Sequence, residues 1–160
     1  MMEKFHQEQL ERIDRLLRII ESDNPYEMVS GLSFYDLVIF ACQSIWHLKD
    51  WVLNDPHFGA KDHAALKVEI HSFRCLLVCS DIANGTKHLS LNHPKIGSTL
   101  SERKGIHVET AKGIFKEFIY VACPDSADEF HGIEVRSLLR QCRDCWTHIL
   151  DKHYLSNVEF

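Results

Sequence analysis

The chain has 160 residues, 45% of them hydrophobic and 26% charged, and its formal net charge is −5. This composition is typical of one folded domain and excludes wholesale disorder. The negative charge argues against a protein that coats nucleic acid with a uniformly basic surface, although it allows a local basic patch.

The first residues, "MMEKFHQEQLER", are charged and lack the apolar core of a signal peptide. No apolar run approaches the ~18 residues that cross a bilayer. We therefore expect a cytosolic protein whose six cysteines stay as thiols and link no partner through a disulfide. The sequence has no glycine-rich phosphate loop, G-x-S-x-G or H-E-x-x-H motif, and we expect no cofactor.

The spacing of apolar residues predicts four clear helices. At the start of the second helix, the Ser33 hydroxyl can cap the chain while Asp36 completes an arrangement like a capping box. The predicted helices cover about residues 3–21, 33–54, 63–89 and 134–153.

Between the third and fourth helices the pattern changes. "NHPKIGSTLSERKG" reads as a loop, whereas "IHVET" and "IFKEFIYVAC" predict two strands of a short antiparallel hairpin. The predicted fold is one mainly helical domain over residues 1–160. It is a bundle of four to five helices with a small β insertion at about residues 105–124.

The third helix is apolar nearly all round, which is typical of a helix at the centre of a bundle. Its sequence then changes abruptly to "DIANGTKH". On a helical wheel Asn84 falls within the apolar stripe, and Asp81 and His88 fall at its edge. We therefore expect all three side chains to point into the bundle.

Three interpretations of this polar stretch stay open. The residues can form a buried hydrogen-bonded network that fixes helix packing. They can instead form a catalytic pocket, with His88 as a proton-transfer group oriented by Asp81 beside Asn84. Gly85 favours a third interpretation, in which the helix simply ends here.

If the second and third helices form an antiparallel hairpin, Tyr35 and Asp36 lie level with Asp81. The same geometry separates His47 from His88 by roughly 28 Å at 1.5 Å per residue. A shared metal site for His47, Asp50, Asp81 and His88 is therefore disfavoured, and no metal is predicted.

The cysteines offer a second possible metal site. Cys75 and Cys79 are spaced i, i+4, and Cys142 with Cys145 forms a C-x-x-C. Four thiolates suit zinc, but both pairs lie in the middle of predicted helices, without the turns of a zinc ribbon. Ordinary buried cysteine is the favoured interpretation.

The fourth helix carries a basic stripe of Arg136, Arg140 and Arg143 at i, i+4, i+7. Such a stripe can be a solvated face paired with nearby acids. The alternative is a face that binds phosphate.

The "ANGTKH" segment resembles the motif of the HEPN superfamily, small bacterial helical-bundle proteins of which many are RNases in toxin–antitoxin or phage-defence systems. That motif is an arginine, often followed by a polar residue, with a histidine four to six residues beyond. Here Asn84 takes the polar position and His88 the histidine position, while Ala83 stands in place of the arginine. The segments "WHLKDW" and "DIANGTKHL" also look like an uncharacterised family of small bacterial proteins.

The resemblance implies RNA as a partner and a homodimer in which two motifs meet. It implies that Arg74 or the arginines of the fourth helix must supply the charge missing at Ala83. Two functional hypotheses follow. The first is an RNA-directed protein of toxin or defence type, either active or catalytically silent. The second is a non-enzymatic dimeric interaction or small-ligand-binding module with a structural polar cluster.

Overall fold

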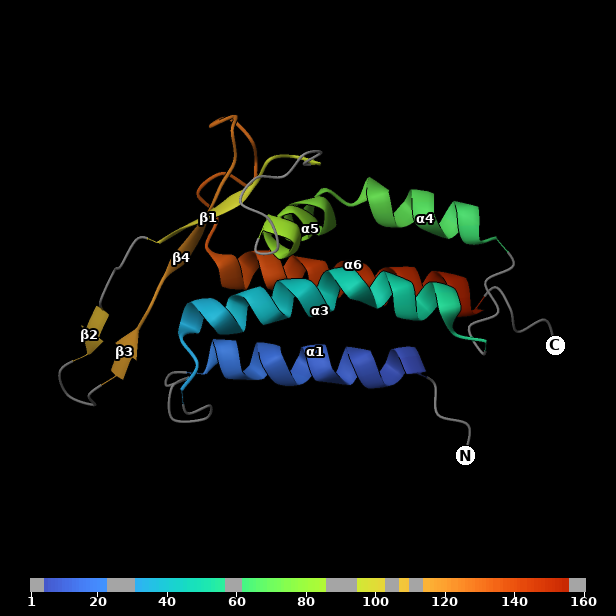
Figure 1. The fold of residues 1–160 in the computed structure, drawn as a ribbon, viewed down its shortest axis with the longest axis horizontal. Coiled ribbons are helices and arrows are strands. Elements are labelled where there is room, and N and C mark those ends of the chain that lie inside the picture. Colours follow the sequence, from blue (N-terminus) through green and yellow to red (C-terminus); the bar gives the residue numbers. More distant parts are fainter. Residues whose placement is uncertain are drawn as a thin grey trace.

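The computed structural model describes residues 5–22, 31–56, 62–85, 95–102, 107–109 and 114–155. Their helices are α1 (Phe5–Glu21), α3 (Phe34–Asn54), α4 (His63–Ser72), α5 (Arg74–Gly85) and α6 (Val135–Leu155). Helices α1, α3 and α6 lie side by side along the long axis of the molecule, and α4 and α5 lie above them (Figure 1). The predicted mainly helical bundle is confirmed.

Helix α3 forms as its sequence predicts. Ser33 is its N-cap: the Asp36 N–H donates to Ser33 Oγ at 3.1 Å, and the Ser33 N–H donates back to Asp36 Oδ2 at 3.1 Å. This reciprocal pair satisfies backbone donors that a helix start leaves free. The stripe expected to face the core is fully buried and consists of Phe34, Val38, Ala41, Ile45, Leu48 and Val52.

Helix α6 packs its predicted apolar stripe into the same core. Trp146 is completely buried, and its Nε1–H donates to the Ile45 carbonyl oxygen of α3 at 3.0 Å. A buried indole N–H needs such a partner, since an unpaired donor would cost free energy. This contact fixes how α6 lies against α3.

The predicted third helix is wrong in one respect, because it is two helices rather than one. Phe73 has extended backbone angles (φ −84°, ψ 106°), and its carbonyl oxygen accepts hydrogen bonds that begin α5. Side chains also bond to carbonyl oxygens of the last turns of α4: His71 Nδ1 bonds to Lys67 O at 2.7 Å, and Ser72 Oγ donates to Glu69 O at 2.6 Å. In Figure 1, α5 crosses the bundle in a different direction from α4.

The β insertion is confirmed, but it starts earlier than predicted. β1 (Thr99–Glu102) pairs antiparallel with β4 (Ile119–Ala122), and β2 (His107–Glu109) pairs antiparallel with β3 (Ile114–Lys116). β1 lies in the segment expected to be a loop. Its partner β4 supplies the buried side chains Ile119 and Val121, so pairing with an apolar strand overrides the weak strand signal of "TLSE".

Within the described part of the chain, no helix is both long and apolar enough to cross a membrane.

Candidate functional site

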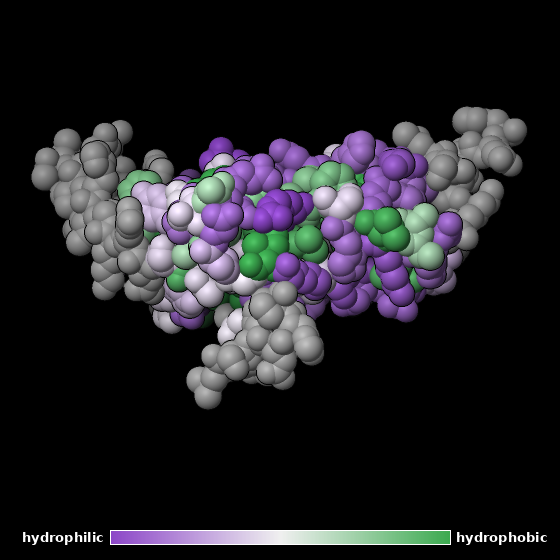
Figure 2. Space-filling view, turned by 90° about the horizontal axis from the view of Figure 1, so that it is seen from above, coloured by the Kyte–Doolittle hydropathy of each residue, from purple (hydrophilic) through white to green (hydrophobic). Residues whose placement is uncertain are grey.

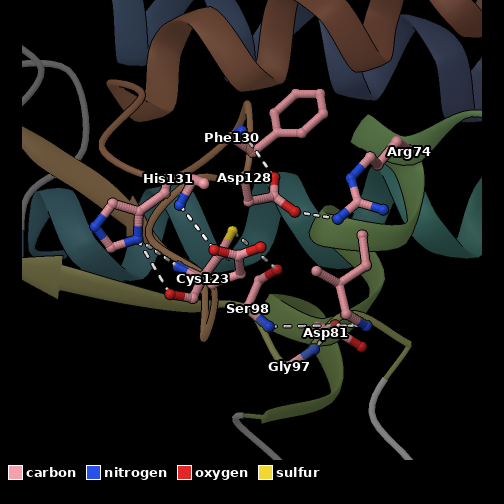
Figure 3. A network of polar contacts seen from close by, with 11 residues as sticks. Arg74, Asp81, Gly97, Ser98, Cys123, Asp128, Phe130 and His131 are labelled. Atoms are coloured by element: carbon pink, nitrogen blue, oxygen red, sulfur yellow. Dashed lines mark hydrogen bonds and ion pairs between the residues drawn. The ribbon is translucent and has the colours of Figure 1, made fainter.

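Asp81 points inward as predicted, and its carboxylate binds backbone. Only 2% of Asp81 is exposed. Asp81 Oδ1 accepts from the N–H of Lys95 at 2.8 Å, and Oδ2 accepts from the N–H groups of Ile96 and Gly97, each at 2.7 Å, and of Ser98 at 3.3 Å. Figure 3 shows the Asp81 side chain beside the backbone of Gly97 and Ser98. Asp81 thereby ties residues 95–98 to α5.

The segment curls around the carboxylate because Gly97 has a positive φ of +83°. Successive N–H groups of such a turn can point at one anion. A Cβ at this position would lie 2.9 Å from Pro124 Cγ, which is closer than carbon atoms approach. On the same side, Ser98 Oγ lies 3.7 Å from Cys123 Sγ. Both the backbone angle and the close approach of Pro124 require glycine here.

Asn84, the second member of the predicted polar cluster, lies at the edge of this network. Asn84 is half-buried, and its Nδ2 donates to Ser80 Oγ at 3.3 Å. Lys95 Nζ donates to the same oxygen at 2.9 Å. His88 lies outside the described residues, so its coupling to Asp81 stays a prediction. Of the three interpretations, the described hydrogen bonds of Asp81 and Asn84 fit the buried structural network.

Tyr35 and Asp36 do not share hydrogen bonds with Asp81 among the described residues. Asp36 is exposed, and its carboxylate accepts from Ser33, whose hydrogen bonds lower the pKa of Asp36. The expected proximity assumed one straight third helix. Because that helix breaks at Phe73, the partners of Asp81 come instead from the segment that follows α5.

The predicted ligand-binding arginines of α6 are all paired inside the molecule. Arg136 is buried, and it donates to Ile20 O at 3.0 Å, to Glu117 O at 3.1 Å and to Glu134 Oε1 at 2.7 Å. On the next turns, Arg140 pairs with Glu21 at 3.0 Å, and Arg143 pairs with Asp14 at 2.5 Å. The stripe therefore joins α6 to acids and carbonyl groups of neighbouring segments. Phosphate binding by these arginines stays a prediction.

Arg74, proposed above as a substitute charge, is paired too. Its guanidinium donates to Asp128, whose other carboxylate oxygen accepts from the Phe130 N–H at 2.9 Å (Figure 3). The hydrogen bond from Arg74, followed by that from Phe130, lowers the pKa of Asp128. The pair links the start of α5 to the segment before α6.

A polar hollow lies between α3 and α4, and we call it the α3–α4 groove. Its volume is ≈ 600 Å³, within the range of ~300–1,000 Å³ usual for ligand sites. Three lysines and one carboxylate line it, which leaves two positive charges in excess (3 − 1). The groove is lined by Trp46, Lys49, Asp50, Leu53, Asn54, His63, Lys67, His71 and Lys95.

The Trp46 ring contacts two of the lysines that line the groove. The Nζ of Lys95 lies 4.0 Å from the centroid of the Trp46 ring, and that of Lys49 lies 5.1 Å from it. The ring of His71 meets Trp46 edge to face, with centroids 5.8 Å apart. Cations over an indole face are attracted by its quadrupole. Partial burial lowers the pKa of Lys95, Asp81 opposes this shift, and Lys49 adds to it.

Trp51 adds an exposed aromatic ring beside this groove. It is 40% exposed and lines a second hollow of ≈ 350 Å³. Asp50 and Asn54 line both hollows, so the two are neighbours on α3. The face of the molecule that carries α4 and α5 is otherwise mainly hydrophilic, with small separate hydrophobic areas (Figure 2).

The sequence interpretation missed this groove, although part of its signal was present. His63, Lys67 and His71 recur at i, i+4, i+8 and therefore share one face of α4. "WHLKDW" supplies Trp46, Lys49 and Asp50 from α3. Nothing in the sequence indicates that Lys95 joins them, because its position depends on the Asp81 anchor.

The described residues contain no group of three or more histidine, cysteine, aspartate or glutamate side chains arranged to hold a metal ion. Comparison of the chain with family models, with curated proteins and with solved structures finds no match. The function is therefore argued from the site.

Proposed function

We propose that the protein binds single-stranded RNA, with phosphates in the α3–α4 groove and a base on Trp51. The observation that carries the proposal is the set of three lysines gathered in a hollow of ≈ 600 Å³ on a chain whose net charge is −5. A basic site on an acidic protein favours an anionic ligand at that place alone.

The lysines suit this role because the protein makes little use of their charge. Lys67 has no ion-pair partner among the described residues, and Lys95 donates to a neutral hydroxyl. Lys49 pairs with Asp50 at 2.6 Å, but that pair is partly exposed and readily exchanges partners. Lysine ammonium groups bind phosphate as point charges without strict geometry, which suits a flexible strand.

Trp51 supplies what a phosphate site alone lacks. Proteins that bind single strands combine a cationic groove with aromatic rings on which bases stack, each worth ~1–3 kcal/mol. Trp51 stands next to the groove and is exposed, whereas Trp46 is covered by lysines. A strand that places phosphate against Lys67 can thus rest a base on the neighbouring indole.

Binding of a fluorescein-labelled octaribonucleotide, followed by anisotropy, tests the proposal. Three phosphate contacts predict an affinity about 20-fold lower at 200 mM than at 50 mM salt, from a slope of about −2 on logarithmic axes. Lys67→Met should weaken binding and reduce that slope by about a third. Lys152→Met is the matched control, since Lys152 is bound to Glu69 on the α6 side of α4. Equal losses in both variants would reject the groove.

Trp51→Ala separates RNA from a simple anion. Loss of one stacked base should reduce affinity by about 5- to 150-fold. Phe40→Ala is the control, because Phe40 is similarly exposed at 43% on the same helix but does not line either hollow. If the two variants behave alike, bases do not stack on Trp51.

The groove volume also suits one small anionic ligand, which belongs to the alternative of a small-ligand module. Adenosine monophosphate distinguishes the two. RNA binding predicts that the mononucleotide competes at least tenfold more weakly than the octamer, whereas a small-ligand site binds it as tightly. RNA cleavage stays a separate prediction, tested by incubating the octamer with the protein and with His88→Ala.

A further inference from the structure

Five of the six cysteines gather where α3, α5 and α6 meet. Two of these five thiols donate to backbone carbonyl oxygens. Cys142 Sγ donates to Cys75 O at 3.3 Å, and Cys79 Sγ donates to Cys42 O at 3.4 Å. All are free thiols. Cys75 Sγ of α5 and Cys145 Sγ of α6 form a direct sulfur pair at 3.3 Å.

This pair differs from its neighbours in access to solvent. Cys42, Cys79 and Cys142 are completely buried and Cys75 is only 4% exposed, whereas Cys145 is half-buried, so small molecules reach the pair from the Cys145 side. A fully buried thiol surrounded by apolar atoms is inert, and a thiol that a reagent can reach is not. Reactivity is therefore confined to one end of the cluster.

Within the pair, Cys75 is the sulfur that more readily loses its proton and becomes the nucleophile. Hydrogen bonds from Cys142 and Cys145 lower the pKa of Cys75 to about 4, and backbone N–H groups at the start of α5 add to the effect while burial opposes it. The hydrogen bond with Cys75 raises the pKa of Cys145. The break at Phe73 contributes, because it leaves Cys75 in the first turn of a helix with free N–H groups.

We propose that Cys75 and Cys145 are an oxidation site at which a hydroperoxide forms a reversible disulfide between α5 and α6. The sulfurs must approach by only ~1.3 Å to reach bonding distance, about 2.05 Å. Cys142 also interacts with Cys75 and with Cys79, but Cys42, Cys79 and Cys142 are completely buried. Cys145 is therefore the partner of Cys75 that a reagent can reach.

The reaction balances in two steps. The Cys75 thiolate attacks one peroxide oxygen, the O–O bond breaks, and the product is a sulfenic acid and, with one proton, water. Cys145 sulfur then attacks Cys75 sulfur and expels hydroxide, which takes the Cys145 proton and leaves as water. Two thiols and one peroxide thus give one disulfide and two waters. A dithiol reverses the change by thiol–disulfide exchange.

Hydrogen peroxide treatment of the native protein, followed by mass spectrometry without reduction, tests the proposal. The chain should lose two hydrogen atoms, and trypsin should release residues 75–87 joined to residues 144–152. Cleavage after Arg143 separates Cys142 from Cys145, so the two cannot be confused. Dithiothreitol should restore the original mass and the separate peptides.

Cys145→Ala should abolish the link. Cys142→Ala should still form it, although more slowly, because one of the hydrogen bonds that lower the pKa of Cys75 is lost. Cys79→Ala should also keep it, which assigns the partner in residues 75–87 to Cys75. Circular dichroism verifies that each variant is folded. If Cys142→Ala does not fold, the Cys79→Ala result and the tryptic map still decide the assignment. Because Cys75 and Cys145 are 70 residues apart, a disulfide between them should raise the Tm by roughly 10 °C under oxidising conditions.

Protein unfolded in urea is the second control, because its six cysteines should pair without preference. A link found equally with Cys142, or the addition of two oxygens to one sulfur without any link, would overturn the proposal. The same is true if peroxide leaves the native protein unchanged while it oxidises the unfolded chain.

Discussion

The arginines of α6 and the lysines of the α3–α4 groove are two basic sets that differ in how the protein uses their charge. Arg136, Arg140 and Arg143 each donate to acids or carbonyl oxygens of other segments. In the groove, Lys67 has no such partner among the described residues. The Lys95 ammonium donates to a hydroxyl and lies over a ring, and Asp81 attracts it without a direct ion pair among the described residues. A basic cluster is therefore a candidate ligand site when the folded protein does not pair its charges internally. A regular spacing of basic residues in the sequence does not show whether those charges are paired.

The largest expected effect belongs to Asp81, which holds the backbone of Lys95 in place. Asp81→Ala leaves four backbone N–H groups without an acceptor and should lower the free energy of unfolding by about 4 kcal/mol. Urea denaturation followed by circular dichroism measures this loss. RNA binding should weaken as well, because Lys95 is positioned by the same anchor. Asp81→Asn keeps one acceptor oxygen and should lose about half as much stability.

Arg136→Met tests the role of the internally paired arginines of α6. The substitution leaves the carbonyl oxygens of Ile20 and Glu117 unsatisfied in a buried site and removes the guanidinium that lies 4.4 Å from the centroid of the Phe34 ring. We expect the free energy of unfolding to fall by about 3 kcal/mol. RNA affinity of the folded fraction should stay unchanged. A loss of affinity at unchanged stability would reverse the comparison and make α6 the phosphate face.

The smallest effect concerns Arg74, whose pair is partly exposed. Because the folded pKa of Asp128 is lowered, the pair stabilises the protein above the ordinary aspartate pKa of ~3.9, and that stabilisation is lost as the pH falls through the folded value. Arg74→Met should therefore reduce the Tm by a few degrees at pH 7 and by less at pH 3. Asp128→Asn should reproduce this pattern. A Tm difference that is the same at both pH values would mean that the pair contributes no titratable stability.

Much of the fold could be predicted because it depends on local periodicity. The buried stripes of α3 and α6 follow directly from apolar spacing, and the Ser33 cap follows from its own hydroxyl. The break at Phe73 could not be found in this way, because "EIHSFRCL" contains neither glycine nor proline. It depends on side chains that cap carbonyl oxygens and on contact between the Phe73 and His148 rings.

The site was predictable only in part, for a related reason. Burial of Asp81 follows from its place on a central helix, but its partners lie 14 to 17 residues further along the chain. A helical wheel shows which face of the helix carries Asp81, but it does not show that residues 95–98 fold back to contact it. The groove likewise depends on Lys95, which reaches α3 only because Asp81 holds its backbone. Pairing of the α6 arginines was one of two stated alternatives, and the identity of each acid needed the packed structure.

The break at Phe73 also allows the sequences of α4 and α5 to change independently during evolution. α4 carries its own terminal hydrogen bonds, and only Leu66 and Ile70 of its side chains are buried. Its outward residues can therefore be replaced without disturbing α5, in which eight side chains are buried. A relative with another ligand preference could arise through substitutions in α4 alone, while the interior of the bundle is inherited intact.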